Sequence, residues 1–322
     1  MTSQSEQIAA ASPTSASTSP TSPTAPRPQT GHGLLTVHIA TLLFGLAGVL
    51  GRLTGLPAPL ITLGRVVFAG LALGIAVVFT RASLRPRRRA DLALLIGQGV
   101  LLAIHWTTFF QAIVVSNVAI GLLAFSSFPL FTAAFEPLIL RQRPSAIQFG
   151  AALFVIPGVA LLVPSLSLSN GATQGVLWGV LAGATFALLS VLNRQLTRSY
   201  PSMAISLYQD SVAALVLLPT LLFVPTGGLF TLRTLLLLLA LGLGCTALAH
   251  TLFIAGLRQV TAQAASLIAS LEPVWGILFA LLLLGEIPSL RTLLGGVIIL
   301  GAAITPGVWE WYGQRSQAIE QN

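Results

Sequence analysis

The sequence predicts an all-α integral membrane protein with ten transmembrane helices arranged as two inverted five-helix repeats. Three observations support this fold class: the composition, a succession of long apolar runs, and a phrase that occurs twice. Of the 322 residues, 55% are hydrophobic and only 7% are charged, whereas a soluble protein has roughly 25% charged residues. Apolar runs of about 18 residues or more are typical of helices that cross a bilayer.

Ten apolar runs follow one another, separated by short segments rich in Gly, Pro, Ser and Arg. Each run is close to the length that a helix needs to cross the hydrocarbon core of a bilayer. The expected helices cover residues 34–53, 58–80, 92–114, 117–140, 145–164, 172–193, 202–224, 234–256, 261–284 and 289–309.

Two halves of the sequence are similar to one another. "FGLAGVLGR" at 44–52 and "FALLSVLNR" at 186–194 are identical at five of nine positions. Prolines then match at a constant offset of 144, which chance similarity between Leu-rich helices does not explain. The matched pairs are Pro57 with Pro201, Pro129 with Pro273, and Pro144 with Pro288.

An odd number of helices in each copy makes the second copy enter the membrane from the side opposite to the first. Repeats of this kind build many secondary transporters, with the substrate site near the midplane. Arginines cluster on the segments that face the cytoplasm if the N-terminus is inside. Twelve lie on that side, Arg27, Arg81, Arg85, Arg87, Arg88, Arg89, Arg141, Arg143, Arg194, Arg198, Arg258 and Arg315, and three on the other, Arg52, Arg233 and Arg291.

The expected organisation follows from these segments. We expect a disordered cytoplasmic tail over residues 1–32, because this Ser/Thr/Pro/Ala stretch has almost no bulky apolar residues. A first five-helix repeat over 33–164, a linker over 165–171, a second repeat over 172–309 and a cytoplasmic tail over 310–322 complete the chain. The protein is expected in the cell (inner or plasma) membrane, with multiple passes and both termini in the cytoplasm.

A family resemblance rests on three stretches. "LIASLEPVWGILFALLLLGEIPSLRTLLGGVIILGAAI" (268–304) is similar to the C-terminal signature of EamA-domain permeases of the drug/metabolite transporter superfamily. "PAPLITLGRVVFAGLAL" (57–73) and "FQAIVVSNVAIGLLAFSSFPLF" (110–131) resemble its first half. The resemblance covers 34–309. It implies a ten-helix secondary transporter, often an exporter of amino acids or other small metabolites, without identifying the cargo.

Ionisable residues within the spans are the candidate site, because each costs about 2.5 kcal/mol or more at membrane depth. Glu272 lies near the centre of the ninth span, before Pro273, which kinks the helix, as Pro129 does in the fourth. Trp275 shares its face. We expect Glu272 to contact a substrate amine or carry a coupling proton; pairing with polar neighbours is the alternative.

Arg65 lies within the second span. It can bind a substrate carboxylate, pair with Glu272, or extend to the outer surface along its aliphatic stem, and we favour the last. In the third span, His105 and Trp106, with Phe109 one turn on, form a polar and aromatic face suited to the wall of a cavity. A satisfied helix–helix contact is the alternative for His105.

The second half carries a further polar group. Tyr208 and Asp210 lie in the inner part of the seventh span, and His250 lies at similar depth in the eighth. An Asp210–His250 pair would be a proton relay, a cytoplasmic gate latch or a stabilising buried pair, and we favour the last. Glu136 is expected to pair with Arg141 or Arg143. The Gly-rich "LGLGCTALAH" (241–250) is interpreted as close helix packing, since no strand precedes it.

Several functions fit such a protein. The leading hypothesis is secondary active export of a small metabolite, an amino acid or derivative, by alternating access. Efflux of cationic or apolar drug-like compounds through Glu272 is an alternative. Exchange of phosphorylated metabolites or nucleotide sugars would need several basic residues in the spans, and only Arg65 qualifies. An intramembrane enzyme is disfavoured because no motif joins Ser126, His105 and Asp210.

The expected partners are a small-molecule substrate, protons and the lipid bilayer, with no nucleic acid and no cofactor. The single cysteine, Cys245, excludes an intramolecular disulfide and a Cys-based metal site. The sequence leaves the substrate, the coupling ion, the direction of transport and the oligomeric state open.

Overall fold

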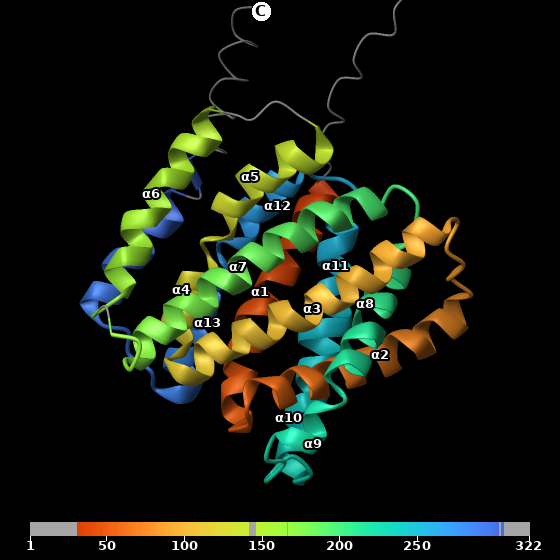
Figure 1. The fold of residues 1–322 in the computed structure, drawn as a ribbon, viewed down its shortest axis with the longest axis horizontal. Coiled ribbons are helices and arrows are strands. Elements are labelled where there is room, and N and C mark those ends of the chain that lie inside the picture. The colour runs from red at the N-terminus through yellow and green to blue at the C-terminus, as the bar shows by residue number, and fades with distance from the viewer. Residues whose placement is uncertain (1–30, 142–145, 166, 303, 306–322) are drawn as a thin grey trace, which may run out of the picture.

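The computed structural model describes residues 31–141, 146–165, 167–302 and 304–305, and all regular elements in these residues are helices (Figure 1). The predicted tails at 1–32 and 310–322 therefore lie almost wholly outside the described residues. Among the described residues, eight helices are long and apolar enough to cross a membrane, and shorter apolar helices at Leu153–Leu162 and Leu290–Ala302 lie within the fifth and tenth predicted spans. The predicted all-α fold class is confirmed.

Six helices make up the first half of the chain, and its fourth span is broken. After α3, two shorter helices, α4 and α5, form the single span Val118–Leu140. The helices are α1 (Gly31–Thr54), α2 (Ala58–Thr80), α3 (Arg89–Val115), α4 (Val118–Phe125), α5 (Phe128–Leu140) and α6 (Ala146–Leu162).

The second half repeats this order, with its third and fourth spans interrupted. The span Leu232–Gly256 contains a π-helical turn, and the span Ala264–Leu284 is broken in the middle. The elements are α7 (Gly171–Leu196), α8 (Ser202–Leu217), α9 (Thr220–Phe223), α10 (Leu232–Gly242), the π-helix η1 (Leu243–Leu248), α11 (Ala249–Gly256), α12 (Ala262–Ala269), α13 (Glu272–Leu284) and the helix Leu290–Ala302.

Prolines at the constant offset mark equivalent helix boundaries. Pro57 precedes α2 with φ −57° and Pro201 precedes α8 with φ −60°, because the proline ring fixes φ and its missing N–H costs nothing at a helix start. Pro129 and Pro273 are the second residues of α5 and α13. The structure therefore breaks both spans completely, at residues 126–127 and 270–271, where the sequence predicts kinks.

The second repeat is inverted relative to the first. Gly171, the first residue of α7, lies so close to the Val115 carbonyl that a Cβ would be 2.4 Å from its oxygen. Arg52, near the end of α1, donates a hydrogen bond to the neighbouring Val114 carbonyl. The start of α7 thus lies at the same end of the bundle as the end of α1. We call this the Arg52 end and the opposite one, where α7 stops, the Arg194 end.

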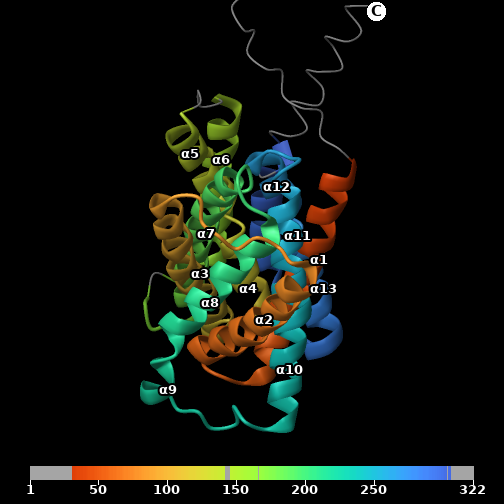
Figure 2. The same cartoon turned by 90° about the vertical axis from the view of Figure 1, so that its right-hand side faces the viewer.

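The first helix of each repeat packs into the other repeat. α1 contacts α11, α12 and α13, whereas α7 contacts α3, α4 and α5. Figure 2 shows the bundle from the side, with the connection from α9 to α10 at the end opposite to the start of α1. This exchange places α1 and α7 beside the two broken spans, at the centre of the bundle.

The outer surface of the bundle is apolar. Large hydrophobic side chains such as Phe79, which is 83% exposed, and Leu222, which is 81% exposed, point away from the protein. A soluble monomer rarely exposes apolar side chains over so many helices. A surface of this kind faces lipid, because helices satisfy their own backbone groups and need no water there.

Candidate functional site

A cavity lies between the two repeats and collects several of the predicted residues. Its walls come from α1, α2, α3 and α4 of the first repeat and from α7 and α13 of the second. The lining residues are Phe44, Ala47, Arg65, His105, Trp106, Phe109, Phe125, Phe186 and Glu272. The described lining of the cavity therefore includes one arginine and one glutamate within an aromatic enclosure.

Arg65 points into the protein, so the favoured prediction that it extends to the outer surface is wrong. It is only 1% exposed. Its Nε donates to Thr246 Oγ1 at 2.8 Å, and Nη2 donates to the Cys245 carbonyl at 3.1 Å. These bonds outweigh snorkelling because Arg65 lies deep in α2, where inward partners are nearer than water.

The partners of Arg65 exist because the eighth span changes its helical pitch. Residues Leu243–Leu248 form a π-helix, and Thr246 donates to the Leu241 carbonyl five residues back. Such turns leave carbonyls free of the usual ladder and occur often at functional sites. Gly242 approaches α2 closely, as predicted for this stretch. The π-turn itself has no clear signal in the sequence, and two of its residues, Cys245 and Thr246, accept from Arg65.

The guanidinium of Arg65 also stacks on aromatic rings. Its Cζ lies 3.8 Å from the centroid of the Trp106 ring and 5.2 Å from that of Phe110. A cation within about 6 Å of a ring face is attracted by the ring quadrupole. Trp106 therefore holds the guanidinium against the cavity wall, which both residues line.

Glu272 is the first residue of α13 and is only 3% exposed. Within the described residues, no side chain or backbone group hydrogen-bonds or ion-pairs with its carboxylate, so the predicted alternative of a pair with Arg65 does not form. Helix N-termini favour negative charge, because their N–H groups are unpaired and the helix dipole is positive there. Arg65 and Glu272 thus line one cavity without an ion pair between them among the described contacts.

His105 lies at the boundary between this cavity and a second one. Its Nδ1 lies 3.0 Å from the Ala182 carbonyl. A carbonyl can only accept, so this contact requires a proton on Nδ1, and a neutral ring then presents Nε2 as an acceptor. The ring centroid lies 5.4 Å from that of Phe186 and 5.7 Å from that of Phe125.

The second cavity combines apolar walls with a few polar side chains, and its described lining residues include no acidic or arginine side chain. It shares Phe44, His105, Trp106 and Phe186 with the first, and its further lining residues are Leu102, Leu189, Ser190, Asn193, His250 and Phe253. Ser190 Oγ and His250 Nδ1 are buried and have no hydrogen-bond partner among the described residues. These atoms are available to a bound molecule or water.

A buried amide cluster closes the second cavity on one side. Gln209 Nε2 donates to Gln98 Oε1 at 2.5 Å and to Asn193 Oδ1 at 2.6 Å. These side chains come from α8, α3 and α7, which are far apart in the sequence. Sequence reasoning missed Gln98 and Asn193 because neutral amides within apolar spans do not stand out as ionisable groups do.

Three predicted site residues lie elsewhere. The predicted Asp210–His250 pair does not form: both carboxylate oxygens of Asp210 lack a hydrogen-bond partner in the described part of the chain, and His250 packs its ring against Trp106 at 5.3 Å. Tyr208 donates to the Leu84 carbonyl, in the connection between α2 and α3. Trp275 packs against α1 at Gly45 and does not line either cavity.

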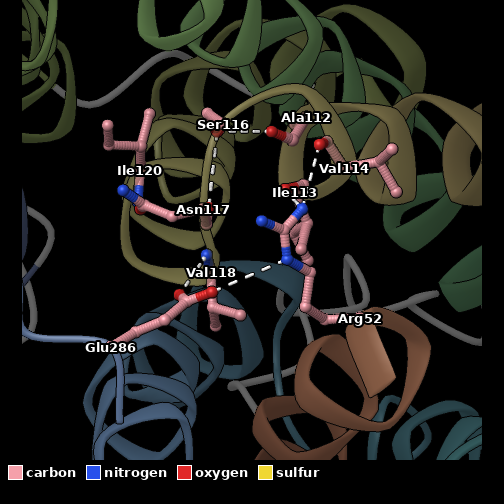
Figure 3. Close-up of polar contacts among 9 residues, drawn as sticks. All are labelled: Arg52, Ala112, Ile113, Val114, Ser116, Asn117, Val118, Ile120 and Glu286. Carbon is pink, nitrogen blue, oxygen red and sulfur yellow. Dashed lines mark hydrogen bonds and ion pairs between the residues drawn. The ribbon is translucent and has the colours of Figure 1, made fainter. Parts of the chain in front are cut away.

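Ion pairs join the repeats at both ends of the bundle. At the Arg52 end, Arg52 Nε lies 3.6 Å from Glu286 Oε1 (Figure 3). At the Arg194 end, Glu136 pairs with Arg194. The packing of α7 against α5 brings Arg194 to Glu136, a partner that was not predicted. Arg143, one of the two predicted partners, lies outside the described residues.

Two inverted, interrupted helical repeats with a cavity between them are the architecture of many secondary transporters. The model of the EamA-like transporter family matches this chain twice, over residues 31–163 and 173–305. The chain therefore belongs to the EamA-like transporter family. It is a multi-pass membrane protein with a small-molecule substrate, and the predicted family is confirmed.

Relatives extend over nearly the same length. The uncharacterized transporter YwfM of Bacillus subtilis is 28% identical over 278 residues, covering 84% of this chain and 93% of the relative. The uncharacterized inner membrane transporter YicL of Salmonella typhimurium is 29% identical over 290 residues, covering 85% and 95%. The pseudopaline exporter CntI of Pseudomonas aeruginosa is 27% identical over 284 residues, covering 84% and 94%.

A solved crystal structure has the same fold. It aligns with a TM-score of 0.66 and 22% sequence identity, covering 86% of this chain and 96% of the other.

Proposed function

We propose that this transporter exports a small zwitterionic metabolite, an amino acid or a derivative, by alternating access. The observation that carries the proposal is the presence of Arg65 and Glu272 in one buried cavity without an ion pair between them. Two unpaired opposite charges are costly in a membrane interior. A ligand with a carboxylate and an ammonium group neutralises both at once.

Arg65 retains binding capacity for a carboxylate. Its bonds to Thr246 and Cys245 use Nε and Nη2, and a guanidinium has further N–H groups arranged to match a carboxylate. Glu272, at the start of α13, accepts from an ammonium group or takes up a proton. We therefore assign the carboxylate contact to Arg65 and the amine contact, or proton coupling, to Glu272.

The second cavity supports a neutral substrate side chain. Ser190, Asn193 and His250 offer hydrogen bonds without an acidic or arginine side chain. A charged side chain placed there would lack a counter-ion, which is unfavourable in a desolvated site. The wall shared with the first cavity is mostly aromatic, so the middle of the substrate is expected to be apolar.

The alternative functions fit this cavity less well. Phosphate esters would need several cationic side chains, and Arg65 is the one arginine that lines either cavity. Efflux of lipophilic cations fits Glu272 and the aromatic rings, but leaves Arg65 as a repulsive charge. This second function predicts that transport improves when Arg65 is neutralised, whereas export of a zwitterion predicts that it fails.

The proposal includes the direction of transport and the membrane in which the protein lies. One relative carries the name of an exporter and another that of an inner membrane transporter, which supports outward transport across the inner or plasma membrane. The Arg-rich connections support a cytoplasmic location for the Arg194 end. Cysteines introduced at Arg85 and Gly227 are expected to react with impermeant reagents from opposite sides; labelling from one side would refute the inverted orientation.

Transport in proteoliposomes tests the substrate class. Purified protein is assayed against neutral, acidic and basic amino acids and a lipophilic cation, with and without a pH gradient. Glu272→Gln is expected to abolish transport of the preferred amino acid at an unchanged protein level. Asp91→Asn is the matched control, since Asp91 accepts from Tyr200 outside the cavities and an amide oxygen can do the same. Wild-type rates in Glu272→Gln would remove Glu272 from the mechanism.

A further inference from the structure

The two ion pairs between the repeats occupy opposite ends of the transport pathway. Arg52 and Arg194 each lie near the end of the first helix of a repeat, and each is the last residue of the repeated nine-residue phrase. Arg52 contacts Glu286, in the connection after α13, and Arg194 contacts Glu136 in α5. Each pair thus joins an exchanged helix to the other repeat.

The acidic partners do not correspond to one another in the repeats. At the offset of 144, the residue that matches Glu286 is Gln142, and the residue that matches Glu136 is Ala280. Duplication alone therefore explains the two arginines but not the two acids. At each end, a glutamate at a non-equivalent position forms the contact with the arginine. This indicates that the Arg–Glu contact itself has a role.

At the Arg52 end, the ion pair also clamps two helix ends (Figure 3). Arg52 Nη1 donates to the Ile113 and Val114 carbonyls at the end of α3, at 3.2 and 2.9 Å. Glu286 Oε2 accepts from the Val118 N–H at the start of α4, at 3.0 Å. A cation at a helix C-terminus and an anion at an N-terminus are both favourable. The helices clamped here, α3 and α4, carry Trp106 and Phe125, which line the central cavity.

We propose that Arg52–Glu286 and Arg194–Glu136 are alternating latches, which determine the end at which the cavity opens. The inference rests on the proposed mechanism of alternating access. In the structure both latches are closed and the cavity residues are buried. Separation of one pair, while the other holds, opens the carrier at that end. The four residues are positioning residues, since none of them is among the described residues that line either of the two cavities.

The surroundings of both pairs suit a latch. The Arg52 and Glu286 side chains are 33% and 24% exposed, and those of Arg194 and Glu136 are 20% and 10% exposed. Ion pairs that keep contact with solvent, as Arg52–Glu286 does, are weak enough to separate in thermal motion. Arg194–Glu136 is the more buried of the two pairs. Removal of one latch is expected to change the ratio of the two open forms by about two- to fivefold. This factor corresponds to the free energy of a partly exposed ion pair.

A cysteine in the cavity reports which end is open. Ala47 lines the cavity on α1, so Ala47→Cys is made in a Cys245→Ala background; Arg65 contacts the backbone carbonyl of residue 245, which this change retains. Right-side-out vesicles receive an impermeant thiol reagent. Glu286→Gln is expected to raise the labelling rate two- to fivefold, and Glu136→Gln to lower it by a similar factor. Glutamine retains an accepting oxygen but loses the charge.

Matched arginine variants control for surface charge at each end. Arg291→Gln removes an exposed arginine that bonds the Leu161 and Val163 carbonyls at the Arg52 end, and Arg198→Gln removes an exposed arginine beyond the end of α7. Both are expected to label like the parent. If either glutamate variant fails to fold, Glu286→Asp and Glu136→Asp, which shorten the arm, test the same opposite directions.

Opposite shifts in the two latch variants support the proposal. Unchanged rates, or shifts in the same direction, in folded protein would overturn it. Because labelling needs no substrate, its outcome is independent of the transport assay. If the labelling rates shift in opposite directions but no amino acid is transported, the latch proposal stands and the proposed zwitterionic substrate is rejected.

Discussion

The guanidinium carbon of Arg65 lies 3.8 Å from the centroid of the Trp106 ring, across the interface between α2 and α3. This stack holds a buried cation in one orientation, while Thr246 and Cys245 fix it from the second repeat. Both repeats thus contribute to the position of a single charge. A change in packing between the repeats necessarily changes the surroundings of that charge, which is a requirement for a carrier site between moving halves.

Arg65→Lys is expected to reduce transport at least about tenfold. A lysine retains the charge but loses the planar fork and the stacked geometry, so it cannot replace both hydrogen bonds. Loss of one charge-assisted hydrogen bond costs about 1.5–3 kcal/mol, and about 1.4 kcal/mol corresponds to tenfold. Transport of the preferred amino acid in proteoliposomes measures the effect. Arg198→Lys, at an exposed position, is the control, and equal activity of Arg65→Lys would show that charge alone suffices.

Thr246→Val is expected to lower the stability of the detergent-solubilised protein. Valine has a similar shape but leaves Arg65 Nε without its buried acceptor and removes the bond to the Leu241 carbonyl. An unpaired buried polar group costs about 1–3 kcal/mol, so thermal unfolding should shift down by several degrees. Thr246→Ser retains the hydroxyl and should unfold near the wild-type temperature. If the valine variant unfolds there too, the Arg65–Thr246 bond is not a stabilising contact.

The sequence predicts the spans and the repeat because both can be recognised from the order of residues alone. Apolar runs of sufficient length, and prolines at a fixed offset, do not depend on tertiary contacts. Glu272, His105 and Trp106 are also predictable as cavity residues, since polar and amphipathic groups at membrane depth have few other places to lie.

The sequence does not predict the contacts that depend on the exchange of α1 and α7. Proximity along the chain suggests that Glu136 pairs with Arg141 or Arg143. The packing of α7 against α5 brings Arg194 into contact with Glu136. Likewise, the contact of Arg65 with the π-turn depends on the packing of α2 against the eighth span. Trp275 and Phe186 are equally apolar in the sequence, and only the packing of the helices places Phe186 in the cavity.

Gly45→Ala is expected to destabilise the contact between α1 and α13. A Cβ at residue 45 would lie 2.8 Å from Trp275 Cβ and 2.9 Å from the Gly276 nitrogen. Backbone atoms cannot move aside as a side chain can, so overpacking costs about 1–3 kcal/mol. Because Glu272 starts α13, transport should fall together with the unfolding temperature. Gly97→Ala on α3, where nothing lies within 4 Å, should change neither; a similar loss in both variants would contradict the close contact.

Ser190→Ala is expected to alter substrate selection without loss of stability. Ser190 Oγ is buried in the second cavity without a hydrogen-bond partner among the described residues, so its removal sacrifices no internal bond and relieves a desolvated hydroxyl. The unfolding temperature should therefore stay the same or rise. Ser206→Ala is the contrasting variant, since Ser206 Oγ accepts from Thr251 at 3.1 Å and its loss should lower that temperature.

The selectivity of the Ser190→Ala variant then tests the role of the second cavity. If Ser190 contacts the substrate side chain, KM should rise for amino acids with a hydroxyl or carboxamide side chain and stay constant for aliphatic ones of similar size. The ratio of the two KM values, measured in one preparation, is independent of protein yield. An equal change for both substrate types would place the side chain outside this cavity and restrict the binding site to the walls around Arg65 and Glu272.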